Sequence, residues 1–349
     1  MAAGYLFGVN LLVTGGAGFI GQCYVRLARR QRPDSKVVNL DALTYAGNLE
    51  SLSDLKDDPG HVFVKGDIRD GELVRQLIAT HKIEAIAHFA AESHVDRSIM
   101  SASPFVDTNV SGTLSMLEAA KDMKVRRYLQ VSTDEVYGSL GPTGAFSETS
   151  PIDPRSPYSA SKAASDHLVS AFHHTHGLDT VTTRCSNNYG PFQFPEKLIP
   201  LMILNAFEGK PLPVYGDGMQ VRDWIHVEDH CSAIDLVLTK GTTGEVYNIG
   251  AENARPNLSV IRDILRLTGA SEDLIKYVPD RLGHDRRYAM DATKVRTELG
   301  WRPSRDFEAG LAETVSWYRN NPAWWERVRS GAYRAYYEQQ YGDRLRTQA

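Results

Sequence analysis

Residues 11–21, LLVTGGAGFIG, decide how the first part of this chain folds. An apolar run leads directly into Gly15, Gly18 and Gly21, and an amphipathic segment follows. In this context the first glycine permits a tight turn, the second lets a pyrophosphate approach the backbone, and the third lets a helix pack on a strand. The helix N-terminus adds N–H donors and a favourable dipole. The stretch therefore predicts a strand-turn-helix unit that binds a dinucleotide.

Asp41 ends the second predicted strand, about 20 residues after the last glycine of the motif. A carboxylate at this place suits the two ribose hydroxyls of NAD and repels the 2′-phosphate of NADP. No Arg stands beside it in the following ALTYAGN. The alternative is a glycine turn with a solvated Asp. Asp67, after the third strand, is a weaker signal, because it could bond an adenine amino group or cap the next helix.

Short β-rich runs alternate with amphipathic stretches through the first half of the chain. This order predicts a parallel sheet with right-handed crossovers. We expect strands at 9–14, 36–41, 61–66, 83–90, 126–132 and 180–185, and helices at 19–30, 71–81, 104–123 and 157–177. The apolar runs LLVTG and AIAHFA are typical of strands covered on both faces.

Prolines and glycines cluster after about residue 186, and the elements become less regular. Helices are expected there at 196–208, 227–239, 258–267 and 291–299, the last with Asp291 as its N-cap. The predicted fold class is α/β, a Rossmann-type doubly wound parallel sheet with a smaller mixed α/β C-terminal substrate domain. The predicted division is 1–185, with a return of roughly 223–250, and 186–349.

The composition is that of a globular protein and argues against binding to nucleic acid or to a membrane. The 349 residues include 39 Lys and Arg against 43 Asp and Glu, a net charge of -4, which favours neither nucleic acid nor an anionic membrane. No apolar run approaches the roughly 20 residues of a spanning helix, and the N-terminus lacks a basic segment. Cys23, Cys185 and Cys231 form no disulfide framework or metal spacing, so a cytoplasmic location is expected.

Tyr158 and Lys162 lie in PYSASK, at the start of a predicted helix. Residues four apart share one helical face, and a Lys ammonium near a phenol lowers the Tyr pKa. The pair predicts a phenol that takes a hydroxyl proton as hydride departs. Because YxxxK is common by chance, an exposed pair is the alternative.

A second polar group follows an apolar strand in VSTDEVYG, where ligands bind in open α/β sheets. Thr133, Asp134 and Glu135 stand there in succession. Two adjacent carboxylates are costly to bury while both are charged, so a solvated loop is one interpretation. Beside a nicotinamide, an acid and a base of different pKa are what an elimination needs.

Several stretches together resemble the extended short-chain dehydrogenase/reductase family, and within it the nucleotide-sugar 4,6-dehydratases. They are TGGAGFIG, the Asp67-Ile68 pair, HFAAESHVDRSI, STDEVYG, YSASK, NNYGPFQFPEKLIP and RDWIHVEDH. The resemblance covers nearly the whole chain, from Val9 to Tyr318. Its specific part is the Thr-Asp-Glu triplet, since the related 4-epimerases lack the acid pair.

The resemblance implies conversion of dTDP-glucose to dTDP-4-keto-6-deoxyglucose and water, with tightly bound NAD. Tyr158 would take the 4-hydroxyl proton while C4 gives hydride to NAD⁺, and Lys162 would hold the nicotinamide ribose. Thr133 would bond the 4-keto oxygen. Glu135 would remove the C5 proton, Asp134 would protonate the leaving 6-hydroxyl, and the hydride would return to C6.

The resemblance also implies which residues bind the two ligands. For the cofactor they are Gly15, Gly18, Phe19, Ile20, Gly21, Asp41, Thr44, Asp67, Ile68, Ala90, Ala91, Thr108, Tyr158, Lys162 and Asn188. For the nucleotide sugar they are Ser93, Thr133, Asn187, Lys197, Leu198, Pro213, Tyr215, Arg222, Asn257, Arg281 and His284. Arg222 is the candidate for the diphosphate, because a guanidinium grips phosphate oxygens as a fork. Leu282 stands where relatives carry proline, which loosens that loop.

Three other features of the sequence have simple structural explanations. His173, His174 and His176 favour contact with a helix C-terminus over a metal site, so no metal is predicted. The aromatic residues 324–325, 333 and 336–337 indicate packing, with a partner surface as the alternative. Cys185 lacks a neighbouring His and is not expected to act as a nucleophile.

The helices at 104–123 and 160–172 carry more apolar residues than one sheet face needs, and the resemblance implies that they pair with a second copy as a homodimer. Three readings compete with the main function. They are a UDP-glucose 4,6-dehydratase, a nucleotide-sugar 4-epimerase, and a non-enzymatic NAD-binding sensor. The candidate catalytic residues Thr133, Asp134, Glu135, Tyr158 and Lys162 argue against the sensor, because a protein that only binds NAD does not need them.

Overall fold

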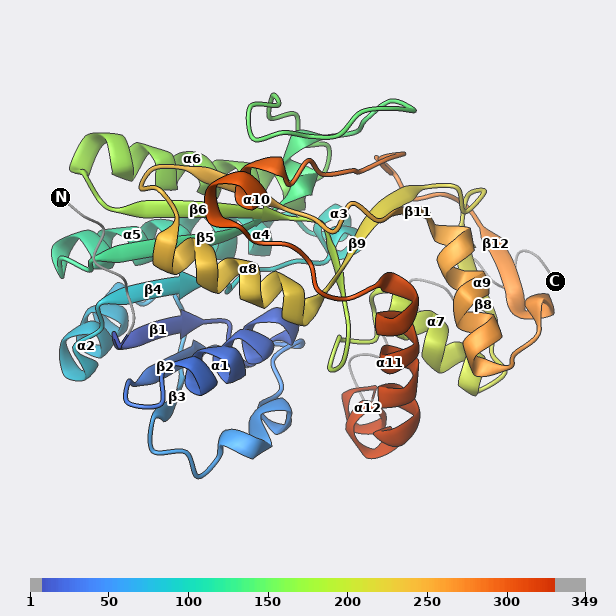
Figure 1. Cartoon of the computed structure of the whole chain (residues 1–349), viewed down its shortest axis with the longest axis horizontal. Coiled ribbons are helices and arrows are strands. Elements are labelled where there is room, and N and C mark those ends of the chain that lie inside the picture. Colours follow the sequence, from blue (N-terminus) through green and yellow to red (C-terminus); the bar gives the residue numbers. More distant parts are fainter. Residues whose placement is uncertain (1–7, 330–349) are drawn as a thin grey trace.

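Seven parallel strands form the central sheet of the computed structural model, which describes residues 8–329 (Figure 1). Their order across the sheet is β10, β6, β5, β4, β1, β2, β3. The bounds are β1 Leu11–Thr14, β2 Val37–Asp41, β3 His61–Lys65, β4 Ala85–His88, β5 Arg127–Thr133, β6 Thr180–Cys185 and β10 Val246–Ile249. The direction of the connections reverses between β1 and β4, so ligands are expected at the carboxyl ends there.

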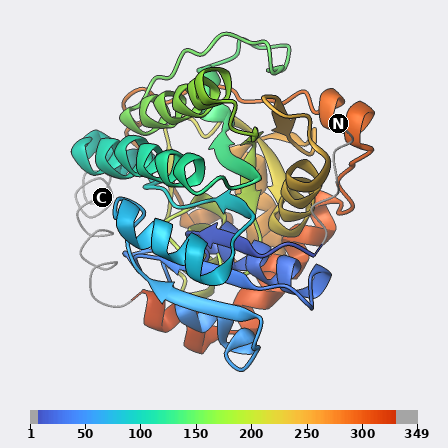
Figure 2. The same cartoon turned by 90° about the vertical axis from the view of Figure 1, so that its left-hand side faces the viewer.

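Helices cover both faces of this sheet, as Figure 2 shows from the end. They are α1 Phe19–Gln31 and α8 Val227–Lys240 on one face, and α2 Gly71–His81, α5 Thr113–Asp122 and α6 Pro157–His176 on the other. Leu11 and Val13 pack into the first layer and Leu12 into the second, because strand side chains alternate between faces. All three side chains are 0% exposed, which explains the continuous apolar run in the sequence.

The helix expected at 104–123 is interrupted. It consists of α4 Ser103–Phe105, a π-helical turn at Val106–Gly112, and α5. The wide turn directs Asn109 inward, where its side chain accepts a bond from the Glu92 amide and donates to the Glu92 carbonyl and the Ser161 hydroxyl. The expected cap Asp291 is also wrong. Helix α10, Thr293–Leu299, has Ala292 as its N-cap residue, while Asp291 accepts a bond from the Thr293 amide.

The C-terminal half contains two small sheets that the sequence did not indicate. One is β11 Ala254–Pro256, β9 Val221–His226 and β7 Asn187–Tyr189, and the other is β12 Ile275–Val278 with β8 Leu212–Tyr215. Four helices surround them, α7 Leu198–Phe207, α9 Asn257–Thr268, α11 Phe307–Asn320 and α12 Pro322–Val328. The strands have three to six residues, too few to show a hydrophobic period. Helix α8 and β10 add to the large sheet. The division into 1–185 and 186–349 stays a prediction.

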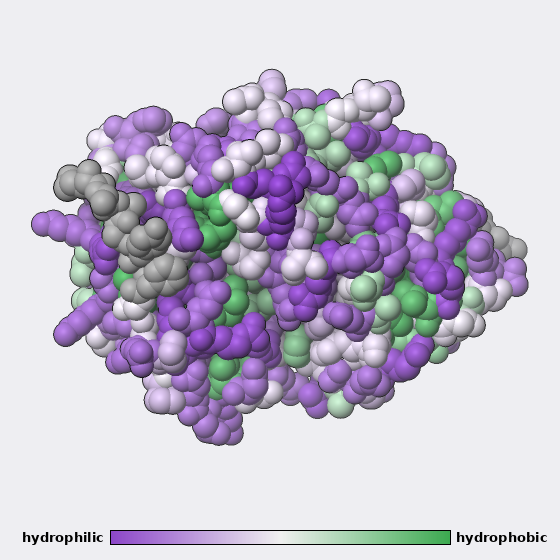
Figure 3. All heavy atoms as spheres, viewed as in Figure 1, coloured by the Kyte–Doolittle hydropathy of each residue, from purple (hydrophilic) through white to green (hydrophobic). Residues whose placement is uncertain are grey.

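Short helical segments complete the described chain. They are η1 Leu49–Leu55, α3 Val95–Met100, η3 Asp134–Tyr137 and η4 Glu272–Leu274. Trp324 is buried in the C-terminal core with Tyr189 and Tyr318, in agreement with a packing role, whereas residues 333, 336 and 337 lie outside the described residues. Figure 3 shows mainly polar side chains on one face of the molecule. Within residues 8–329, no helix has the length and apolar character needed to cross a membrane.

Candidate active site

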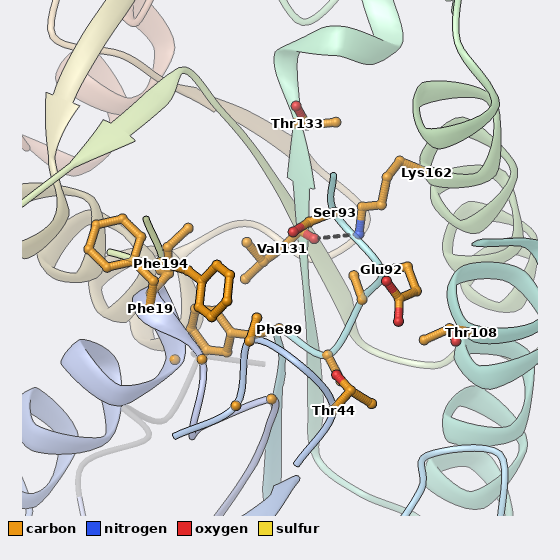
Figure 4. A pocket seen from close by; sticks show the side chains of 18 of the residues that line it. Phe19, Thr44, Phe89, Glu92, Ser93, Thr108, Val131, Thr133, Lys162 and Phe194 are labelled. Carbon is orange, nitrogen blue, oxygen red and sulfur yellow. Dashed lines mark hydrogen bonds between the residues drawn. The ribbon is translucent and has the colours of Figure 1, made fainter. Parts of the chain in front are cut away.

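A cavity of about 610 Å³ lies at the carboxyl ends of the parallel strands. Every residue predicted to bind the cofactor lines it, and so do Thr133, Asp134 and Glu135. Figure 4 shows Phe19, Phe89 and Phe194 gathered on one side of this cavity and Thr108 on the opposite side. The fold therefore brings together residues from the carboxyl ends of six strands, β1 to β6, and from helix α6.

The glycine turn leaves no space for side chains. Gly15 has φ +70°, and a Cβ there would lie 2.7 Å from the Ala90 amide nitrogen. A Cβ on Gly21 would overlap the Gly15 carbonyl oxygen. Helix α1 begins at Phe19 after Gly18 and has no side-chain cap and no acid in its first turn. Its N-terminus therefore offers backbone donors and a positive dipole end to the cavity.

Both oxygens of the Asp41 carboxylate are held by the backbone. Oδ2 accepts a bond from the Ala17 amide at 2.9 Å, and Oδ1 from the Leu43 amide at 2.8 Å. Burial raises the pKa of Asp41, while these two bonds lower it. Asp67 forms an ion pair with Arg69 at 2.6 Å, which lowers the Asp67 pKa. It does not cap α2, because Asp70 has that place.

Tyr158 and Lys162 are buried at the start of α6, so the exposed pair is excluded. A capping box between Ser156 and Ser159, with Pro157 in the first turn, begins the helix. The Lys162 ammonium donates to the Val131 carbonyl at 2.8 Å (Figure 4).

The expected lowering of the Tyr158 pKa is not what the structure shows. Burial raises this pKa well above its usual value, the charge of Glu135 adds to the increase, and a hydrogen bond with Thr133 opposes it. Burial also lowers the Lys162 pKa, and Asp166 opposes that change. The difference arises because the sequence shows which charges are near in the chain but not how much water the fold removes.

The two adjacent carboxyls are inside the protein, which excludes a solvated loop. Asp134 is 2% exposed, and within residues 8–329 its Oδ2 atom has no hydrogen-bond partner. Burial, followed by the charge of Glu135, raises the Asp134 pKa well above its usual range. Burial also raises the Glu135 pKa, but the cations Arg281, Arg222 and Lys197 act in the opposite direction. Burial therefore favours a proton on both carboxyls, and the three cations oppose this effect at Glu135, which makes Asp134 the better candidate for the acid of the pair.

A second cavity of about 160 Å³ opens beside the first. Arg222 lies in it, stacked over the Tyr288 ring at 4.2 Å, and donates to the Asp285 carbonyl at 2.9 Å. Arg281 approaches Asp96 at 3.5 Å. The remaining predicted nucleotide-sugar residues are divided between the cavities. Ser93 and Thr133 line the first, Pro213, Tyr215, Asn257 and His284 the second, and Asn187, Lys197 and Leu198 both.

Several lining residues were not predicted. Glu92, Asp96, Phe194, Glu196, Gln220 and Trp224 contribute to one cavity or both. Asp96 and Glu196 stand within stretches that carried the resemblance, but no spacing distinguishes them from surface acids.

Among the described residues no group of three or more potential metal ligands gathers. His173 contacts the Leu178 carbonyl at 3.0 Å beyond the end of α6, and burial raises the Cys185 pKa, which favours an unreactive thiol.

The family model described as GDP-mannose 4,6 dehydratase matches residues 12–314. A dTDP-glucose 4,6-dehydratase of Xanthomonas campestris pv. campestris (strain B100) is 56% identical over 341 residues, which cover 93% of this chain and 97% of the relative. The corresponding enzyme of Neisseria meningitidis serogroup B is 53% identical, with coverage of 93% and 97%. The chain therefore belongs to the family of the GDP-mannose 4,6 dehydratase model.

Solved structures of related enzymes have the same fold as this chain. A crystal structure of dTDP-glucose 4,6-dehydratase from Bacillus anthracis in complex with NAD has a TM-score of 0.87 and 51% identity, and covers 92% of this chain and 99% of that one. DesIV, a dTDP-glucose 4,6-dehydratase of Streptomyces venezuelae with NAD and TYD bound, has a TM-score of 0.89 and 51% identity, with coverage of 91% and 99%. A UDP-glucose 4-epimerase of Thermotoga maritima reaches 30% identity and a TM-score of 0.84, with coverage of 90% and 99%.

Proposed function

We propose that this protein is an NAD-dependent hydro-lyase that converts dTDP-glucose to dTDP-4-keto-6-deoxyglucose and water. The observation that carries the proposal is the buried Asp134–Glu135 pair at the end of β5, beside Tyr158 and next to both cavities. An oxidoreductase that only moves hydride needs one proton acceptor. An elimination needs a second base and an acid, and the pair supplies them.

The first cavity fits NAD. Its wall has backbone where Cβ atoms at Gly15 and Gly21 would stand, and α1 presents unpaired backbone donors to a pyrophosphate. Asp41 is oriented by two backbone bonds toward the place of a ribose diol. Bound NAD supplies the acceptor and later the donor of the hydride. We propose the full predicted cofactor set as its binding residues, with Lys162 at the nicotinamide ribose.

The remaining steps are proton transfers by this chain's own side chains. Burial disfavours the Tyr158 phenolate, but the positive charges of Lys162 and of the bound nicotinamide would favour it, and in this form Tyr158 takes the proton of the sugar 4-hydroxyl. Thr133, which bonds the Tyr158 hydroxyl, also holds the sugar 4-oxygen. The 4-ketone acidifies the neighbouring C5 position, where Glu135 takes the proton and returns it after the elimination, as the 6-deoxy product forms. Asp134, whose pKa is raised by burial and by the charge of Glu135, gives its proton to the departing 6-hydroxyl.

The second cavity provides the charges that a nucleotide diphosphate requires. We propose that Arg222 and Arg281 bind the diphosphate and that Lys197, which lines both cavities, lies between the diphosphate and the sugar. Ser93, Asn187 and the other predicted substrate residues would complete the site. In support, DesIV of Streptomyces venezuelae was crystallised with TYD bound.

We also propose a cytoplasmic homodimer, with α5 and α6 at the contact between subunits. The nearby segment exposes Met100 at 50% and Val106 at 49%, large apolar side chains that a partner would cover. Sedimentation at micromolar concentration tests this, and a particle of only 38.8 kDa would contradict it.

The test of the function is incubation with dTDP-glucose, followed by the base-labile absorbance of a 4-keto-6-deoxy sugar. We expect this chromophore and one water lost per sugar. A 4-epimerase would give the galactose epimer without it, and a sensor would bind NAD without turnover. Competition between dTDP-glucose and UDP-glucose decides the nucleotide, which depends on how the pocket surrounds one methyl group.

A further inference from the structure

Three side chains from distant parts of the sequence meet beside the cofactor cavity. The Arg97 guanidinium lies over the Tyr45 ring at 4.0 Å, and its Nε donates to a Glu196 carboxylate oxygen at 3.2 Å. The Tyr45 hydroxyl also hydrogen-bonds Glu196. Each member therefore contacts the other two, and no ligand atom is needed to complete the cluster.

Each of the three lies in, or next to, a different chain segment that lines the first cavity. Tyr45 follows β2, and its neighbours Thr44 and Ala46 line the cavity. Arg97 belongs to α3, directly after the lining segment Glu92–Ser93, and Figure 1 places α3 where the large sheet meets the C-terminal half. Glu196 itself lines the cavity, from the segment that precedes α7. The cluster thus connects three chain segments that border the first cavity.

Two further contacts tie the same segments together. The Tyr45 ring meets the Phe194 ring edge-on at 5.6 Å, and Phe194 lines the cavity beside Phe19 in Figure 4. The Lys197 ammonium donates to the Ser93 carbonyl at 3.0 Å. These contacts join segments that border the space along the strand ends, where a dinucleotide would lie.

The energetics favour a closed arrangement. Glu196 is 6% exposed, and the charge of Lys197, followed by the charge and hydrogen bond of Arg97 and the hydrogen bond of Tyr45, offsets the loss of water around its carboxylate. A guanidinium over a phenol ring adds attraction that strengthens where water is excluded. Separating the segments that carry Tyr45, Arg97 and Glu196 breaks these contacts at once and removes one of the two cations that stabilise the buried acid.

We propose that Tyr45, Arg97 and Glu196 form a latch that closes the cofactor cavity and limits the exchange of NAD. The proposal rests on the proposed function, in which one NAD serves many turnovers. The three are positioning residues, and none of them touches the reacting atoms. Arg97 and Tyr45 line neither cavity, and Arg97 is the one that contacts both other members through its guanidinium, so its substitution tests the latch without changing a lining residue.

The experiment measures both rates of NAD exchange in the full-length protein, by stopped-flow fluorescence of NADH mixed with protein and by its displacement with excess NAD. Arg97→Met removes the charge and the stacking plane, and Arg97→Lys keeps the charge alone. Arg75→Met is the matched control, since Arg75 pairs with Asp122 at 2.7 Å and its side chain is 32% exposed against 28% for Arg97.

In Arg97→Met we expect entry and exit to become about tenfold faster together, so that the NAD dissociation constant changes much less than either rate. Arg97→Lys should lie between it and the wild type, and Arg75→Met should match the wild type. If NADH left Arg97→Met faster but bound at the wild-type rate, Arg97 would be a contact that stabilises bound cofactor. If both rates stayed at the wild-type value, Arg97 would have no role in cofactor exchange. Either result overturns the latch. Should Arg97→Met fail to fold, Arg97→Lys decides by the same two rates. A wild-type protein that takes up no NAD would instead contradict the proposed function.

Discussion

The first cavity, which we propose holds the cofactor, is shaped by backbone. The second cavity, which we propose holds the nucleotide diphosphate, is shaped by charged side chains that contact one another and nearby rings. The first depends on strand ends and on a turn that admits no Cβ at Gly15 or Gly21. The second depends on the Arg281–Asp96 approach and the stacking of Arg222 on Tyr288. A backbone site fails abruptly when an atom is added, but a site made of paired charges changes by degrees.

The two cavities meet at Glu135, which lines both. Its pKa shows the influence of each side, because burial raises the value and the cations of the nucleotide cavity lower it. The difference between the cavities therefore suggests a division of work. We propose that the first cavity determines whether the cofactor binds, and that the cations of the second adjust the protonation of Glu135, the proposed base.

The largest effect is expected at this meeting point. Glu135→Gln removes the base for C5 and should reduce turnover roughly a hundredfold or more, while oxidation at C4 continues. Mixing the variant with dTDP-glucose should therefore produce the absorbance of reduced nicotinamide without the 4-keto-6-deoxy product. Dehydration at the wild-type rate would show that another group is the base.

Gly21→Ala tests the backbone cavity. The added Cβ overlaps the Gly15 carbonyl oxygen, so the turn must move and the phosphate donors with it. We expect NAD affinity to fall by at least about tenfold, as measured by titration with NADH fluorescence. Gly141→Ala is the control, because nothing lies within 4 Å of a Cβ there. Equal NAD affinity in both variants would refute the comparison of the two cavities.

Arg281→Met tests the charged cavity through pH. Arg281 is the strongest of the cations that lower the Glu135 pKa, so its loss should raise that pKa further. The base works when deprotonated, and the acid limb of the pH profile of kcat should therefore move to higher pH, with saturating substrate throughout. Arg286→Met, which breaks an exposed pair with Asp217, should leave the limb in place. A limb that moves to lower pH would contradict this sign.

Leu282→Pro should have the smallest effect. Leu282 is 77% exposed and precedes Gly283 at φ +63°, the arrangement of a type II turn that favours proline before glycine. A proline there restricts the unfolded chain and should stabilise the protein by about 0.4–1 kcal/mol. Thermal unfolding measures the change, and a lower melting temperature would mean that the native backbone at this position does not suit proline.

Much of the large sheet was predictable from local patterns. The bounds expected for α2 and β6 are those of the structure, and the other strands of the first half differ by few residues. Strands covered on both faces are continuously apolar, and a glycine turn marks the end of the first one. Motifs at strand ends share one edge of a parallel sheet, and the residues predicted for the site all line one cavity or both, while their roles stay predictions.

The amino-acid sequence by itself determined the parallel sheet, the dinucleotide turn and the set of acids and bases at its edge, because each is encoded within a few neighbouring residues. Only the tertiary structure decided the small sheets, the meeting of Arg97 with Tyr45 and Glu196, and the raised pKa of Tyr158. These depend on contacts between residues far apart in the chain and on how much water the packed protein excludes, and neither quantity is written in a local pattern.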